Sequence, residues 1–154
     1  MRCASCGGNI LWDEPCDRCG IEYDEMLANI SHPEMRRLFK RIDEMQDCCC
    51  DISLEASLMA CELENSSLIL PAMIDGDSWG IVQLPGPKKK EYIALCTDME
   101  EFNKCFSQLT PLTNSWKRQL ELLEAGADGF VINPLGEVCF LEREYLDRYF
   151  SGDE

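Results

Sequence analysis

The sequence predicts an α+β fold in which a mixed sheet packs against helices, preceded by a small N-terminal β-hairpin. Three observations lead to this prediction. Two Cys-x-x-Cys pairs stand within the first 19 residues. Apolar residues then recur at helical spacing up to about residue 64, and short apolar runs separated by turn residues follow, as in strands. We therefore divide the chain into a tetracysteine zinc ribbon (1–22), a helical connector packing on the core (23–64) and an α+β domain (65–154).

The ribbon is predicted from two similar turns, residues 3–7 and 16–20. Together they supply four thiolates, from Cys3, Cys6, Cys16 and Cys19. Four thiolates close the tetrahedral sphere that zinc prefers, and a closed sphere leaves no open position for catalysis. Gly7 and Gly20 follow the second cysteine of each pair, where glycine allows a sharp bend. We expect one structural zinc per chain, with an iron ion or a thioredoxin-like dithiol as alternatives.

Two helices are predicted in the connector, after a linker or short helix over residues 21–30. Ser31 to Glu34 has the pattern of a capping box with proline in the first turn, so a helix should begin there and run to about residue 48. A second helix is expected over residues 53–64. The run of Cys48, Cys49 and Cys50 is unusual, because neighbouring helical residues point in different directions. We expect one of the three to face the core, in preference to a second metal site.

The α+β domain should alternate strands and helices. We expect strands over 68–74, 79–84 and 91–96, with a turn at 75–77 and a basic loop at 86–90. A capping box from Thr97 to Glu100 predicts a helix through about Phe106, and a later helix from about Asn114 should end at Gly126. Strands over 130–132 and 138–141 should flank the turn at 133–136, and a helix over 142–150 follows.

Three segments of this domain are similar in sequence to segments of a known protein family. They are Leu-Ile-Leu-Pro at 68–71, Ala-Leu-Cys-Thr-Asp-Met-Glu-Glu-Phe at 94–102 and Gly-Phe-Val-Ile-Asn-Pro-Leu-Gly at 129–136. From about Leu68 onward the chain resembles the N-terminal domain of the SseB family, the enhanced-serine-sensitivity proteins of bacteria. The resemblance implies a mixed sheet, no established catalytic residues and a role as an interaction or accessory module. The ribbon is an addition to the family pattern, and Leu95 to Thr97 replaces a more usual aromatic-Thr-Ser sequence.

The net charge and composition of the chain limit the kinds of partner that it can bind. The chain has 14 Lys and Arg against 29 Asp and Glu, a formal net charge of -15. Such a field repels phosphate backbones and anionic membrane surfaces, so we expect no nucleic-acid partner and no membrane partner. The basic residues at 36–41 should pair with acidic neighbours along their helix. Cysteines stand where the apolar region of a secretory signal would have to be, which favours the cytoplasm.

We expect a non-enzymatic module that binds a protein partner. His32 is the single histidine, and beside Pro33 at a helix start it should serve structure rather than act as a catalytic base. The expected interaction surface comprises Trp79, Asn133, Pro134 and Gly136. Two alternatives stay open: an enzyme of unknown class with a pocket on the α+β domain, and a nucleic-acid-associated zinc-ribbon protein. An apolar pocket with convergent polar groups would favour the enzyme, and an exposed apolar patch would favour the module.

Overall fold

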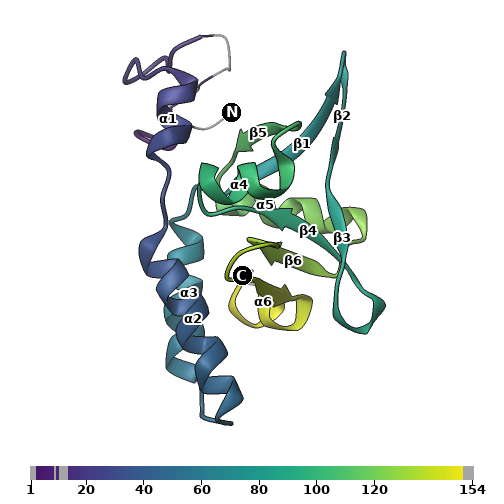
Figure 1. The fold of residues 1–154 in the computed structure, drawn as a ribbon. Coiled ribbons are helices and arrows are strands. Elements are labelled where there is room, and N and C mark those ends of the chain that lie inside the picture. The colour runs from purple at the N-terminus through teal and green to yellow at the C-terminus, as the bar shows by residue number, and fades with distance from the viewer. Residues whose placement is uncertain (1–2, 9, 11–13, 151–154) are drawn as a thin grey trace.

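The computed structural model describes residues 3–8, 10 and 14–150, and its helices and strands confirm the α+β class (Figure 1). The helices are α1 (Tyr23–Asn29), α2 (Pro33–Asp47), α3 (Ser53–Glu64), α4 (Met99–Phe106), α5 (Trp116–Glu121) and α6 (Arg143–Phe150), with 3-10 turns η1 (Pro87–Lys89) and η2 (Leu122–Ala125). The strands are β1 (Ile69–Asp75), β2 (Ser78–Ile81), β3 (Gln83–Pro85), β4 (Glu91–Leu95), β5 (Thr110–Thr113), β6 (Gly129–Ile132) and β7 (Cys139–Glu142).

The strands form two sheets. One has the order β2-β1-β5 and is antiparallel, and the other has the order β3-β4-β6-β7 with β4 parallel to β6. The single strand predicted over 79–84 is in fact two strands, because the chain passes from one sheet to the other at Val82. Ile69 and Cys96 exchange two backbone hydrogen bonds of 2.9 Å, which tie the sheets together.

Two cores cover the two faces of the four-stranded sheet. Alternate residues of a strand point to opposite faces, and here Ile93 and Phe130 join a first core that includes side chains of α2, α3 and α6. Tyr92 and Val131 point the other way, into a second core shared with α1, α4 and the N-terminal cysteine turns. Among the described residues, the first core contains none before Met35. The N-terminal turns thus pack on the body through the second core only.

The cap residues of two helices differ from the prediction by one position. His32, not Ser31, precedes α2, and its side chain makes no capping hydrogen bond. Asp98, not Thr97, caps α4, where its carboxylate accepts a 2.9 Å hydrogen bond from the backbone N–H of Glu101. The predicted capping boxes were therefore wrong in their cap residue, although both helices begin where expected. Thr97 is fully buried, and its backbone N–H donates a hydrogen bond to the side chain of Asn133.

The strand β5 was not predicted. Its four residues include Pro111, and proline is normally read as a break because it cannot donate a strand hydrogen bond. The structure accommodates it because β5 lies at the edge of its sheet, paired on one side with β1. The following helix agrees with the prediction: Ser115 caps α5, and Gly126, with φ of 111°, ends the helical segment in the left-handed region.

Candidate metal centre and interaction surface

The two cysteine turns have the same backbone hydrogen bond. The glycine that ends each turn donates to the carbonyl oxygen of its first cysteine, Gly7 to Cys3 at 2.9 Å and Gly20 to Cys16 at 3.0 Å. Gly7 and Gly20 have φ of 82° and 77°, in the left-handed region that glycine favours, which confirms the predicted bends. Residues 9 and 11–13 of the predicted hairpin connection lie outside the described residues.

These turns bring the four predicted ligands together. The sulfur atoms of Cys3, Cys6, Cys16 and Cys19 all lie within 4.8 Å of one another, with 3.8 Å between Cys3 and Cys19 and 3.5 Å between Cys6 and Cys16. Four sulfurs held at about 2.3 Å from a zinc ion would be about 3.8 Å apart along the tetrahedron edges. A disulfide needs about 2.05 Å, and all four cysteines are free. The cluster can therefore hold a metal ion in four-coordinate geometry.

Backbone N–H groups bond to these sulfurs. The N–H of Cys19 lowers the pKa of Cys16 to about 6, helped by the N–H of Arg18 at 3.4 Å from the Cys16 sulfur. The N–H of Ile21 lowers the pKa of Cys19. Desolvation and the neighbouring sulfur atoms raise this pKa by more, to about 12. Cysteine binds a metal ion as the thiolate, so a metal ion displaces the remaining thiol protons as it binds.

The cluster is anchored to the body on one side. Cys3 and Cys16 are 0% and 4% exposed and belong to the second core, whereas Cys19 is exposed. The backbone N–H of Ala4 donates to the sulfur of Met26 in α1 at 3.2 Å. α1 in turn reaches β5, because the Tyr23 hydroxyl donates to the carbonyl oxygen of Pro111. A metal ion bound here would fix the N-terminal turns against α1 and the sheets.

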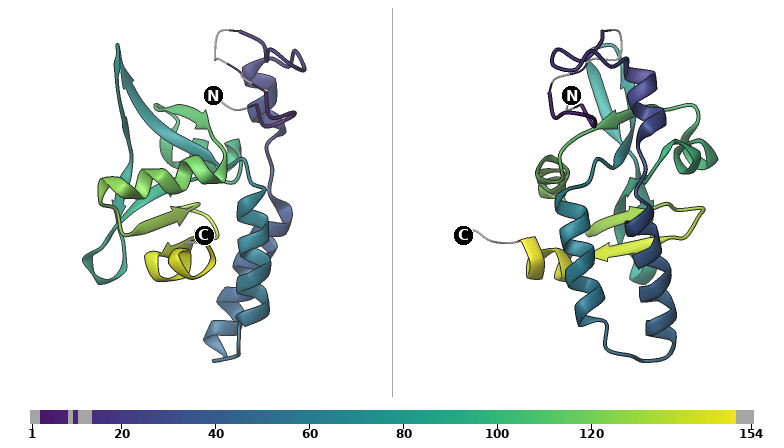
Figure 2. Two further views of the ribbon diagram at one scale, coloured as in Figure 1. Left: turned by 180° about the vertical axis from the view of Figure 1, so that it is seen from behind. Right: turned by 90° about the vertical axis from the view of Figure 1, so that its left-hand side faces the viewer.

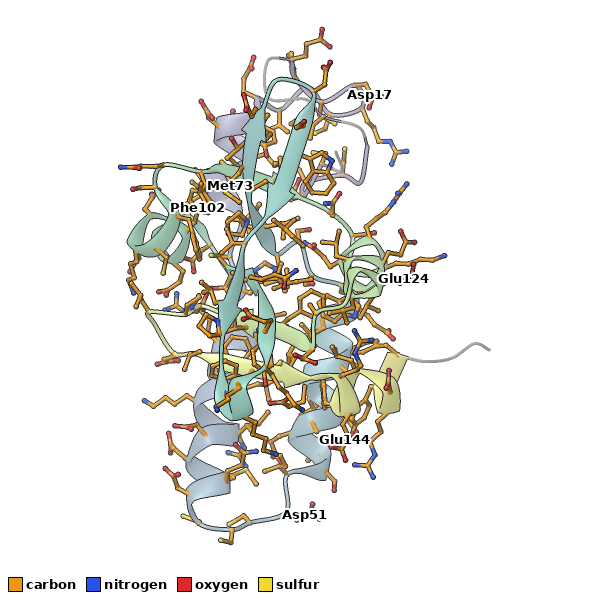
Figure 3. The ribbon with its side chains drawn as sticks, turned by 90° about the vertical axis from the view of Figure 1, so that its right-hand side faces the viewer. Asp17, Asp51, Met73, Phe102, Glu124 and Glu144 are labelled. Carbon is orange, nitrogen blue, oxygen red and sulfur yellow. The ribbon has the colours of Figure 1, made fainter. Side chains whose placement is uncertain are left out.

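Trp79, the first residue of the expected interaction surface, is 57% exposed. It lies opposite Ile74 across the β1–β2 pair and on the same face, whereas Met73, the preceding residue of β1, lies opposite Gly80 and points to the other face (Figure 3). All three are large exposed apolar side chains. We call Ile74 and Trp79 the hairpin patch. The sequence analysis placed Trp79 on the surface and missed Met73 and Ile74, because they continue the apolar run that predicted the strand over 68–74.

Asn133 does not belong to any surface, and that prediction was wrong. Its side chain is 0% exposed, accepts a 3.0 Å hydrogen bond from the backbone N–H of Thr97 and donates one of 3.0 Å to the Thr97 hydroxyl. Pro134 and Gly136 are half-buried in the following turn. A Cβ atom on Gly136 would come within 2.1 Å of a carboxylate oxygen of buried Glu101, so this glycine serves close packing. Within the turn, Leu135 is the exposed apolar residue, at 68%.

His32 has a structural position, as its place before Pro33 predicted. Its Nδ1 lies 2.7 Å from the carbonyl oxygen of Thr97, and its Nε2 accepts a 3.1 Å hydrogen bond from the N–H of Ser67. Burial lowers the pKa of His32, which favours the neutral ring. A cavity of about 320 Å³ lies beside it, lined in part by Ser31 and Glu62. Both ring nitrogens are already engaged, so His32 connects the start of α2 to the ends of β4 and α3.

The three adjacent cysteines lie on the turn after α2. Figure 2 shows this turn at the far end of the α2–α3 pair, away from the sheets. Cys48, Cys49 and Cys50 are all exposed, so the expectation that one would face the core was wrong. The reason is that α2 ends at Asp47, before the run begins. Within the described part of the chain, only the four N-terminal cysteines form a group of three or more metal-ligating side chains.

The fold and the cysteine cluster define an α+β protein that can hold a metal ion near its N-terminus. Comparisons with protein-family models, with curated proteins and with solved structures find no match to this chain. None of the helices in the described ranges combines the length and the apolar character that crossing a bilayer requires.

Proposed function

We propose that this protein is a non-enzymatic, zinc-stabilised protein-interaction module of the SseB-like type that acts in the cytoplasm. The observation that carries the proposal is the hairpin patch, in which two large exposed apolar side chains, Ile74 and Trp79, lie opposite one another on one face of the β1–β2 pair. Clustered exposed apolar residues are typical of protein-binding surfaces, and tryptophan is enriched among the residues that contribute most to binding. The resemblance of the chain from about Leu68 onward to the SseB family supports the accessory role.

Zinc is the ion that we assign to the four cysteines. Thiolates are soft ligands, and zinc accepts four of them in the tetrahedral arrangement that the sulfur distances match. With four thiolates the ion has no open position for water or substrate, so we assign it a structural role. A reducing compartment such as the cytoplasm keeps thiols available for zinc, and the 11 cysteines of the chain are all free.

The basic residues of α2 support the absence of a nucleic-acid partner. Three arginines form ion pairs with carboxylates: Arg36 with Asp98 at 3.0 Å, Arg37 with Glu34 at 2.8 Å and Arg41 with Glu55 at 3.2 Å. Pairing along the helix was expected for all three, but Arg36 reaches α4 and Arg41 reaches α3. Side chains held by carboxylates are less available to neutralise phosphates, which is the main source of nucleic-acid affinity.

Capture of partners from the native host tests the proposed function. We expect the tagged chain to retain specific protein, a second copy included, and the Ile74→Ser/Trp79→Ser variant to retain at least tenfold less. Both side chains are exposed, so the folded state should persist, as circular dichroism can verify. Leu135→Ser is the matched control, because it removes an apolar side chain elsewhere that is even more exposed than Ile74 and Trp79. Equal losses from the two variants, or no retention by the wild-type chain, would contradict the proposal.

A further inference from the structure

One continuous segment forms the free edge of both sheets. β2 is the outer strand of the order β2-β1-β5, and β3 is the outer strand of the order β3-β4-β6-β7. The two strands follow one another along one side of the molecule (Figure 1), and Figure 3 views that side with the segment in front. Eight residues, 78–85, make up this edge, which at about 3.3 Å per residue is about 26 Å long.

The edge lacks the usual protection against pairing. Natural edge strands carry charged side chains, proline or bulges, because their outer N–H and C=O groups otherwise attract another strand. Residues 78–86 include no charged residue, and Pro85 stands at the far end of the segment. Trp79 is exposed near the other end, and Ile81 and Val82 are half-buried. A long, uncharged edge with apolar side chains is therefore suited to strand addition.

The two ends of this edge carry opposite charges. Asp75 and Asp77 flank the tight turn at one end, and both are exposed. Lys88 and Lys89 are exposed in the loop at the other end, with φ of 61° and 60° in the left-handed region. Lysine adopts this conformation at an energetic cost. Their neighbour Lys90 is engaged in an ion pair with Glu142 at 3.7 Å.

We propose that this edge pairs with the same edge of a second copy of the chain, antiparallel about a two-fold axis. The inference rests on the proposed function and names the partner of the hairpin patch. In a two-fold interface each residue meets its counterpart reciprocally, so the acidic end of each copy lies beside the basic end of the other. A pairing centred on Gln83, whose backbone groups face outward, brings Asp77 of one copy level with Lys89 of the other. A parallel pairing would place like charges together.

The net charge of -15 on each copy does not prevent this pairing. At about 0.15 M salt the Debye length is about 8 Å, so charges far from the edge are screened and the local arrangement decides. A uniformly basic strand from another protein would suit Asp75 and Asp77 but would meet Lys88 and Lys89 at the other end. The polarised edge therefore fits a second copy better than a basic segment.

Sedimentation velocity of the full, zinc-loaded chain at about 0.15 M salt tests the inference. We expect a dimer with a dissociation constant of about 10 µM or tighter. Asp75→Lys/Asp77→Lys should weaken it by about 10- to 100-fold, because several surface ion pairs become repulsive. Lys88→Glu/Lys89→Glu should weaken the dimer by a similar factor. The quadruple variant carrying both changes should recover the dimer to within a few-fold, because the charges are exchanged end for end.

The matched control is Asp43→Lys/Glu44→Lys, which changes the net charge equally on α2, outside both sheets. We expect it to leave the dimer intact. A monomeric wild-type chain, or a dimer that the quadruple variant fails to recover, overturns the inference. If the chain is monomeric but the Ile74→Ser/Trp79→Ser variant still loses a captured protein, the second copy is excluded while the proposed function stands. If that variant loses nothing, the proposed function fails, whatever the charge variants do.

Discussion

Removing the metal should lower the melting temperature of this chain by about 10 °C while the remainder still unfolds cooperatively. Structural zinc sites bind with about 10–16 kcal/mol, and most of that energy folds the segment around the ion. The first core contains no described residue before Met35, so it persists without the metal. The second core loses Cys3, Ile10 and Cys16. Burial of these side chains is worth about 3 kcal/mol, and each kcal/mol shifts the melting temperature by about 2–4 °C.

Differential scanning calorimetry with and without a strong chelator measures this effect. Cys16→Ser should reproduce the chelated state, since it removes a ligand that also belongs to the second core. Cys61→Ser is the control, because Cys61 is exposed on α3 and lies outside the cluster. Loss of all cooperative melting on chelation would show that the body cannot fold without the ribbon. An unchanged melting temperature would show that the ribbon contributes nothing to the second core.

Asn133→Ala should destabilise the chain by about 3 kcal/mol. The variant leaves the buried N–H of Thr97 without its partner, at a cost of about 1–3 kcal/mol, while the Thr97 hydroxyl keeps the Asp98 carboxylate as its acceptor at 3.1 Å. It also places alanine at φ of 55°, which costs about 1–2 kcal/mol more for a residue with a Cβ atom and no polar side chain. Urea denaturation of the two chains measures the difference in free energy of unfolding.

Asn133→Gly separates the two contributions of Asn133. Glycine adopts the left-handed region freely but cannot bond to Thr97, so it should recover about 1 kcal/mol relative to alanine. A glycine variant no more stable than the alanine variant would mean that the backbone conformation carries no cost. An alanine variant within about 0.5 kcal/mol of the wild type would remove Asn133 from the residues that hold β4 and β6 together.

Local patterns were enough to predict the clustering of the four N-terminal cysteines and most helices. Each cysteine turn is set by its own residues, since two thiols three positions apart and one glycine determine the bend. The helix over 53–64 agrees with α3 at both ends, because its boundaries depend on residues close in sequence. The spacing of the two pairs then implied that four sulfurs would meet.

What the sequence could not predict depends on contacts between distant residues. Asn133 appeared to be a turn residue, and its burial follows from Thr97, 36 positions earlier in the chain. The change of sheet at Val82 leaves no local signal, because both halves of the run are strands. β5 depends on an edge position that its own four residues do not determine. The hairpin patch likewise required knowing that the core ends before the tip of β1.

The central claim is that Cys3, Cys6, Cys16 and Cys19 hold one zinc ion per chain. Elemental analysis of protein purified anaerobically from its native host tests it most directly. We predict about one equivalent of zinc in the wild-type chain, a much lower content in Cys16→Ser and an unchanged content in Cys61→Ser. Less than about half an equivalent of any transition metal, full occupancy of Cys16→Ser, or iron in place of zinc would contradict the claim.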